Sequence, residues 1–191
     1  MEIKKENAIA AYNAADENTK KALLLLLPEL EEAVKLKDIT ERVKTFEDAV
    51  EILGEEHPFV CAYYCIEDID ECNNDIAAFL KLRIVCAALN EGWEPQFTEG
   101  EERWFPWFTL WTEEELSKKS DEWKADRHLI STGDYSGDYA GLAYADSFNS
   151  SSDTPASIGF RLCLKSEALA TYCGKQFIEL WADFNLIRKQ S

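Results

Sequence analysis

Apolar residues recur at helical spacing through the N-terminal quarter of the chain. The stretch TKKALLLLL supplies one apolar face, Pro28 ends it, and PELEEAVKL continues with apolar positions on a charged background. In TFEDAVEILGEE, Thr45 and Asp48 have the spacing of a capping box, and Gly54 is placed to end the helix. We therefore predict helices across residues 5–55.

The helical pattern then weakens, because a short apolar run, FVCAYYCI, is followed by the acidic EDIDECNND. The next stretch, DIAAFLKLRIVCAALNEGW, is apolar on most of its surface and carries stop signals at Asn90 and Gly92, which favours a buried helix. We interpret residues 57–75 as an acidic joint. It would connect a helical N-terminal segment, residues 1–56, to an aromatic-rich main domain, residues 76–191.

Aromatic residues dominate the region from residue 93 to residue 148. Both faces of RWFPWFTLW are aromatic, so no half-exposed alternation is visible, and Pro106 would have to lie at an edge or a bulge of a sheet. The TEEELSKKSDEWKADRH segment predicts a short exposed helix opened by Thr112 and Glu115. We expect most of the aromatic side chains to pack in the core and a few to remain exposed. The region holds twelve of them: Trp93, Phe97, Trp104, Phe105, Trp107, Phe108, Trp111, Trp123, Tyr135, Tyr139, Tyr144 and Phe148.

The last third of the chain predicts a loop, a strand and a helix. The polar residues within 141–157 lead directly into IGFRLCL. We interpret residues 141–157 as an ordered surface loop and residues 158–164 as a strand. SEALATYCGKQFIELWADFNLI predicts one C-terminal helix, in which Gly174 costs about 1 kcal/mol. The whole pattern indicates an α+β protein with a helical N-terminal segment, a small antiparallel sheet in an aromatic-rich domain, and a C-terminal helix.

The net charge of the chain disfavours two classes of binding partner. The chain has 191 residues and a net charge of −17, from 20 basic and 37 acidic side chains. This charge disfavours direct binding to nucleic-acid phosphates or to anionic membranes. The apolar run from Ala22 to Leu27 is too short for a signal sequence or a membrane span. We therefore expect a cytoplasmic protein whose cysteines are reduced and packed as small apolar groups.

The acidic excess is concentrated towards the N-terminus. Residues 1–75 hold eight basic and 19 acidic side chains, a net of −11, whereas residues 76–191 have a net of −6. Two interpretations are open: a solvated helical face, or an acidic surface that mimics DNA or docks a basic partner. The second gives an alternative function, inhibition of a basic nucleic-acid-binding protein.

None of the short motifs is a complete catalytic or metal site. DIDECNND has calcium-like acid spacing, but Cys72 and Phe79 stand where an EF-hand requires an oxygen ligand and its last Glu. Cys61, Cys65 and Cys72 lack the Cys-x-x-Cys pair of a zinc site, and the eight glycines form no phosphate-binding array. A hydrolase that uses a Cys or an Asp with His128 is the least favoured hypothesis. We predict no catalytic residue, no metal and no cofactor.

Exposed aromatic side chains next to polar ones would form a recognition surface, because aromatic faces bind with little loss of entropy and polar groups give direction. We predict such a surface within residues 135–153, with Tyr139, Tyr144, Asn149 and Asp153 as ligand-binding residues. The ligand would be a glycan, a peptide or a protein.

Three blocks of sequence carry a resemblance: TFEDAVEILG (45–54), ALNEGWEPQFTEGEERWFPWF (88–108) and IGFRLCLKSEALATYCGKQFIELW (158–181). Over nearly its whole length the chain resembles an uncharacterised family of gut bacteria and their phages or mobile elements. The family brings no activity, so the resemblance implies a phage-related or mobile-element context and leaves the chemistry open. Relative to that family, TEEELSKKSDEWKADRH is an insertion.

FNSSSDTPAS followed by IGFRL also resembles the ending of the C-type-lectin-like fold, which formylglycine-generating enzymes share with ligand-display proteins of phages. In that fold a polar variable loop runs into the last core strand. The oxidative chemistry of the enzyme branch is not implied, because its cysteine pair does not align with Cys163 or Cys173. We therefore expect a non-enzymatic binding or accessory protein of phage or mobile-element origin.

Overall fold

The chain divides into two compact units, Met1–Arg42 and Val43–Ser191, which we describe separately. The structure is a computed structural model. It describes residues 8, 11–12, 15, 17–27, 38–66, 69, 74–96, 98–150 and 160–189.

The first unit includes α2 (Glu17–Leu26) and α4 (Ile39–Arg42), and its described residues 8, 11 and 12 are also helical. Helix α2 is built from the predicted TKKALLLLL stretch, and its Leu25 and Leu26 side chains are exposed. The helix predicted from PELEEAVKL lies outside the described residues.

The second unit begins with the predicted capped helix, α5 (Phe46–Leu53). Thr45 Oγ1 accepts a hydrogen bond from the Asp48 backbone N–H at 3.1 Å, and the Asp48 carboxylate accepts one from the Thr45 N–H at 2.9 Å. Gly54 follows with a φ of 84°, a conformation that glycine adopts without steric cost. The capping box and the helix end are therefore confirmed.

Helix α6 (Pro58–Tyr64) lies within the stretch that we interpreted as a joint. The His57 ring nitrogen Nδ1 accepts a hydrogen bond from the Phe59 N–H at 3.2 Å, and Pro58 occupies the first turn, where no donor is needed. The next helix, α8 (Asn74–Asn90), ends at Asn90 as predicted and is buried along most of its length. Both α5 and α6 pack against α8.

The packing of α5 and α6 sets where the chain divides. Because their apolar faces are covered by α8, both helices belong to the second unit, which starts at Val43. The boundary expected after residue 56 therefore lies inside that unit, and the structure divides the chain 14 residues earlier, after Arg42.

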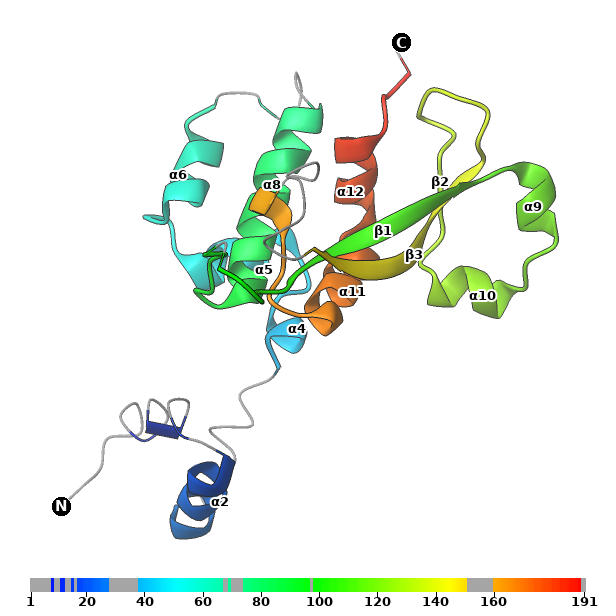
Figure 1. Ribbon diagram of the computed structural model, residues 1–191. Coiled ribbons are helices and arrows are strands. Elements are labelled where there is room, and N and C mark those ends of the chain that lie inside the picture. The colour runs from blue at the N-terminus through cyan, green and yellow to red at the C-terminus, as the bar shows by residue number, and fades with distance from the viewer. Residues whose placement is uncertain are drawn as a thin grey trace. The chain divides into compact units, whose positions relative to one another are not determined.

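Strands β1 (Arg103–Trp111), β3 (Gly141–Ser150) and β2 (Ile130–Ser131) form an antiparallel sheet in that order. Strand β1 is thus an edge strand of this sheet, and its register shifts between Trp107 and Phe108. Pro106 lies at the edge and next to the bulge, as the sequence predicts. Figure 1 shows α11 (Glu167–Gln176) and α12 (Ile178–Asn185) behind β1 and β3.

The interpretation of residues 141–157 as a surface loop is wrong for residues 141–150. Residues 141–150 form β3, the central strand, which pairs with β1 on one side and β2 on the other. The buried side chains of Leu142 and Tyr144 anchor it to the helices. Pairing with β1 from Gly141 to Ser150 outweighs the low strand propensity of its Ser, Asn and Asp residues, whereas β2 pairs only with Gly141 and Leu142. Residues 151–157 lie outside the described part of the chain.

The prediction of a strand over residues 158–164 is also wrong for residues 160–162, which the structure describes. Residues Phe160–Leu162 form a single turn of 3₁₀ helix, η1. Leu164 makes an isolated bridge with Trp104, in which each backbone N–H donates to the other residue's carbonyl oxygen at 2.9 Å. Asn90 fixes this segment, because its side chain donates to the Cys163 carbonyl and accepts from the Lys165 N–H.

Two predicted single helices are each divided in two. The exposed segment after β1 forms α9 (Glu113–Ser117), opened by the expected Thr112 capping box, and α10 (Asp121–Asp126), capped by Ser120. The C-terminal segment forms α11 and α12, which separate at Phe177. Helix α11 packs against β1 and β3, whereas α12 packs mainly against α8, so one straight helix would not serve both contacts.

Candidate functional site

An apolar cavity of about 330 Å³ lies where β1 and β3 meet α8 and α12. Seven aromatic side chains line it, and the Asn185 amide is the one polar side chain among its described lining residues. The lining consists of Phe79, Phe105, Pro106, Trp107, Phe108, Leu110, Leu142, Phe148, Leu162, Trp181, Phe184, Asn185 and Leu186. Its volume is within the range of small-molecule binding pockets.

Four consecutive residues of β1, 105–108, all line the cavity beside an irregularity in the β1–β3 pairing. A regular strand directs alternate side chains to opposite faces, but the pairing changes from Trp107 opposite Asp146 to Phe108 opposite Tyr144. Ala145 of β3 is therefore the extra residue of a bulge, and such a bulge increases the local twist of the strands. Phe105 and Phe148 are paired across the two strands, with ring centroids 5.7 Å apart.

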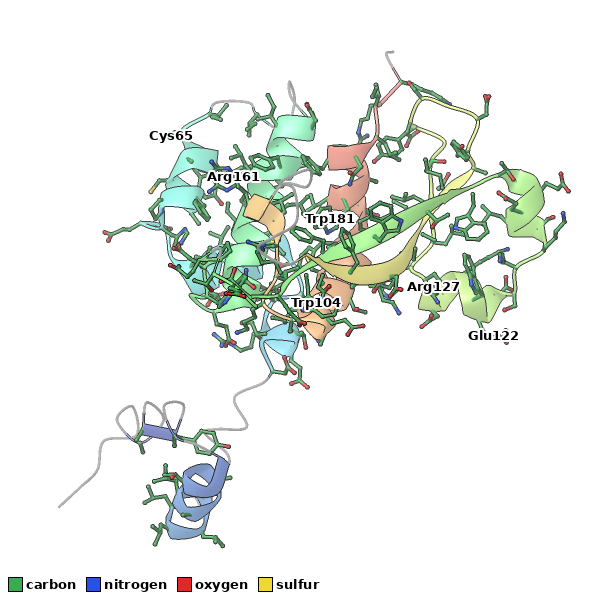
Figure 2. The ribbon with its side chains drawn as sticks, viewed as in Figure 1. Cys65, Trp104, Glu122, Arg127, Arg161 and Trp181 are labelled. Atoms are coloured by element: carbon green, nitrogen blue, oxygen red, sulfur yellow. The ribbon has the colours of Figure 1, made fainter. Side chains whose placement is uncertain are left out.

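The helices supply the opposite wall. The rings of Phe79 from α8 and Phe184 from α12 stack with centroids 5.8 Å apart. Trp181 projects from α12 towards β1, where its ring lies 5.7 Å from that of Phe108 (Figure 2). Trp181 is buried, whereas Phe184 and Trp107 are 36% and 56% exposed and form the rim. The cavity is therefore open to ligands past two aromatic side chains.

The lining determines what the cavity can hold. None of its described side chains is charged, so a buried ionic group would be left without compensation there. A water molecule has a share of about 30 Å³ in the liquid, so the cavity accepts about ten groups of that size. The arrangement suits a small, uncharged and largely apolar molecule.

The four ligand-binding residues predicted from the sequence are not gathered at one place. Tyr139 is 48% exposed and precedes β3, while Asn149 is exposed near the other end of that strand. Eight residues of strand separate Gly141 from Asn149, which corresponds to about 26 Å. Tyr144 is buried, and Asp153 lies outside the described residues.

The cavity residues contributed by the helices were missed at the sequence level. Phe79, Trp181 and Phe184 occur at helical spacing and were interpreted as ordinary core positions. The aromatic region did contain the strand residues of the cavity, so the concentration of aromatic side chains was the useful signal. What no local pattern shows is that two distant helices bring three more rings to the same strands.

The two histidines and the other possible catalytic or metal-binding residues do not form a common site within the described part of the chain. His128 is exposed, with a φ of 50°, and lines a second cavity of mixed polar and apolar character with Lys44 and Lys175. His57 caps α6. Within the described part of the chain, no three His, Cys, Asp or Glu side chains are grouped so as to hold a metal ion.

The buried cysteines behave as packed apolar groups. A hydrogen bond to Cys173, together with burial, raises the pKa of the Cys86 thiol, and burial raises the pKa of Cys163 to about 11. Such thiols carry little thiolate at neutral pH and are poor nucleophiles. Cys61 and Cys65 are exposed on and after α6, and all five described cysteines are free.

Comparisons of the chain with protein-family models, with curated proteins and with solved structures give no match. None of the helices in the described residues has both the length and the apolar character needed to cross a membrane. The α+β fold and the cavity geometry therefore carry the functional argument.

Proposed function

We propose that this chain is a non-enzymatic binding protein whose aromatic cavity holds a small, uncharged, largely apolar molecule. The observation that carries the proposal is the cavity itself, with seven aromatic rings and no charged side chain among its described lining residues. A glycan needs several directional polar groups, and the lining offers only the Asn185 amide. This favours an apolar molecule over a glycan, which was one of the three ligand classes left open by the sequence.

The direct test uses N-phenyl-1-naphthylamine, an uncharged probe whose fluorescence rises in apolar surroundings. We expect saturable binding to the full-length protein. Trp107→Ala and Phe184→Ala remove partly exposed rim rings, so the fold should be retained while affinity falls about tenfold, through lost contact area.

Tyr139→Ala is the matched control, because it removes an exposed aromatic side chain that does not line the cavity. Its affinity should equal that of the wild type. If Tyr139→Ala or Asn149→Ala abolished binding while Trp107→Ala left it unchanged, the site would be the surface predicted from the sequence, and the cavity would be rejected.

A second candidate function is the acidic inhibitor that mimics DNA. Its specific support is charge: residues 43–75 hold ten acidic side chains and one basic one, Lys44. Four of these acids, Glu47, Glu51, Glu55 and Glu56, are exposed around α5. Binding to a basic protein would then compete with duplex DNA and weaken steeply with salt. Salt-insensitive binding of an apolar molecule with no such competition would exclude it.

The phage or mobile-element context belongs to both candidates and rests on the resemblance of the three sequence blocks. Gene neighbourhood separates the two candidates. Phage structural genes beside the coding sequence would support a binding or accessory protein, whereas anti-defence genes would support the inhibitor.

A further inference from the structure

Within the part of the chain that the structure describes, two arginines of the second unit have no acidic partner, although the sequence is rich in acids. This unit contains five arginines, and three of them lie within 4.0 Å of a carboxylate: Arg103 with Glu101, Arg127 with Asp126, and Arg188 with Asp183. The described residues give Arg83 and Arg161 neither an ion pair nor a hydrogen bond. In a chain of net charge −17, this arrangement of two cations calls for an explanation.

Arg83 lies on α8, and its guanidinium group stacks on the Phe59 ring. Its guanidinium carbon lies 3.8 Å from the centroid of the Phe59 ring and 5.9 Å from that of Phe79. Its Nε atom is buried without a hydrogen-bond partner among the described groups. Stacking on an aromatic face fixes the plane of a guanidinium while leaving its N–H groups free to donate.

Arg161 comes from η1, which packs against α8, and its side chain is exposed beside that helix (Figure 2). In keeping with this packing of η1 on the helix that carries Arg83, burial lowers the pKa of Arg83 and the positive charge of Arg161 lowers it further, so the two guanidinium groups repel each other. An anion held by both groups would remove this repulsion and satisfy the donors.

We propose that Arg83 and Arg161 form a binding site for a phosphoryl group, which both guanidinium groups contact while Phe59 supports Arg83. Two guanidinium forks match the several oxygens of a phosphoryl group, and two positive charges balance its dianion. The net negative charge of the chain acts over distances that salt screens to about 10 Å, so the local pair dominates at the site.

The site is separate from the aromatic cavity and does not depend on the function proposed for it. Phe79 contacts both, because it lines the cavity and lies under Arg83. Neither guanidinium lines the cavity. Loss of phosphoryl binding would therefore leave binding of the apolar probe unchanged.

The test measures binding of inorganic phosphate and of phenyl phosphate to the full chain by calorimetry, at constant ionic strength set with sodium chloride. Arg161→Gln should weaken binding at least tenfold, since it removes one of two charge-assisted contacts. Arg161→Lys should be intermediate, because an ammonium keeps the charge but loses the fork. If phenyl phosphate binds more tightly than inorganic phosphate, the ligand of the site is a phosphate ester. If inorganic phosphate binds more tightly, the ligand is the free ion.

Arg42→Gln is the control, because it removes one exposed arginine from the first unit and changes the net charge equally. It should bind as the wild type does. Arg161 is exposed, so its replacement should not unfold the chain, and circular dichroism verifies this. The proposal is overturned if neither phosphate compound binds at about 10 mM, or if Arg161→Gln binds as tightly as Arg42→Gln.

Discussion

The hydroxyl group of Tyr144 lies 2.9 Å from both Ser147 Oγ and Thr171 Oγ1, inside the contact between β3 and α11. The two smaller hydroxyls also contact each other at 3.2 Å. The buried Tyr144 and Ser147 and the partly buried Thr171 therefore satisfy one another where the sheet meets the helix. For Tyr144 the structure supports a role in joining two elements.

Replacing Tyr144 with Phe should lower the free energy of unfolding by about 1 kcal/mol, because two buried hydrogen bonds are lost while Ser147 and Thr171 keep each other. Urea denaturation followed by circular dichroism measures the change. Tyr139→Phe removes the same atom from an exposed ring and should leave the midpoint unchanged. Equal midpoints for the two variants would contradict the assignment of Tyr144 to the core.

For single residues, the sequence showed which aromatic side chains are present but not which of them are buried. Both tyrosines occur in the same aromatic region, and no local pattern distinguishes the exposed one from the buried one. Their burial depends on which residues of α11 and β1 face β3, and these elements are distant from the two tyrosines along the chain. Thr171, the partner of Tyr144, lies 27 residues away in the sequence.

Among the elements, the two capping boxes are the features that the sequence predicts best. Thr45 with Asp48 and Thr112 with Glu115 form the expected reciprocal hydrogen bonds. Backbone N–H groups that donate to the carboxylates lower the pKa of Asp48 and of Glu115. Cap formation depends on four consecutive residues, so local sequence is sufficient to predict it.

These shifts predict an acid-dependent loss of stability. The ordinary pKa values are 3.8 for Asp48 and 4.5 for Glu115, and both are lower in the folded chain. The contribution is therefore fully present above the ordinary values and is lost as the pH falls through the folded ones. Urea midpoints at about pH 6 and about pH 3 measure it, and Asp48→Asn combined with Glu115→Gln should reduce the difference between them. An unchanged difference would contradict the role of the two caps.

Elements that depend on distant partners were predicted less well. Strand β3 contains several polar residues and becomes a strand because β1 pairs with it from Gly141 to Ser150. The break at Phe177 arises because α11 and α12 pack against different layers. Helix α6 was overlooked since seven residues are too few to show a clear period.

For the whole molecule, the division after Arg42 is the feature with the clearest consequence. The α+β class and the small antiparallel sheet were predicted correctly from the order of helical and aromatic segments. The cavity was not predicted, because its lining comes from two strands, two helices and η1. Such a site exists only after those elements have packed.

A fragment of residues 43–191 should fold alone with the denaturation midpoint of the full chain, because the second unit contains its own core. A fragment of residues 57–191 is the control. It lacks α5, whose apolar face packs on α8, and should be clearly less stable. Similar midpoints for the two fragments would place the division at residue 56, as the sequence analysis expected.

The close approach of α11 to the sheet has a consequence for how sequences of this fold diverge. A methyl group added at Gly174 would lie 2.5 Å from Pro106 Cβ and 3.0 Å from the Tyr144 ring. Positions 106, 144 and 174 therefore share one fixed volume, and a larger residue at one requires a smaller residue at another. In related chains these three positions should vary together, although 68 residues separate the first from the last.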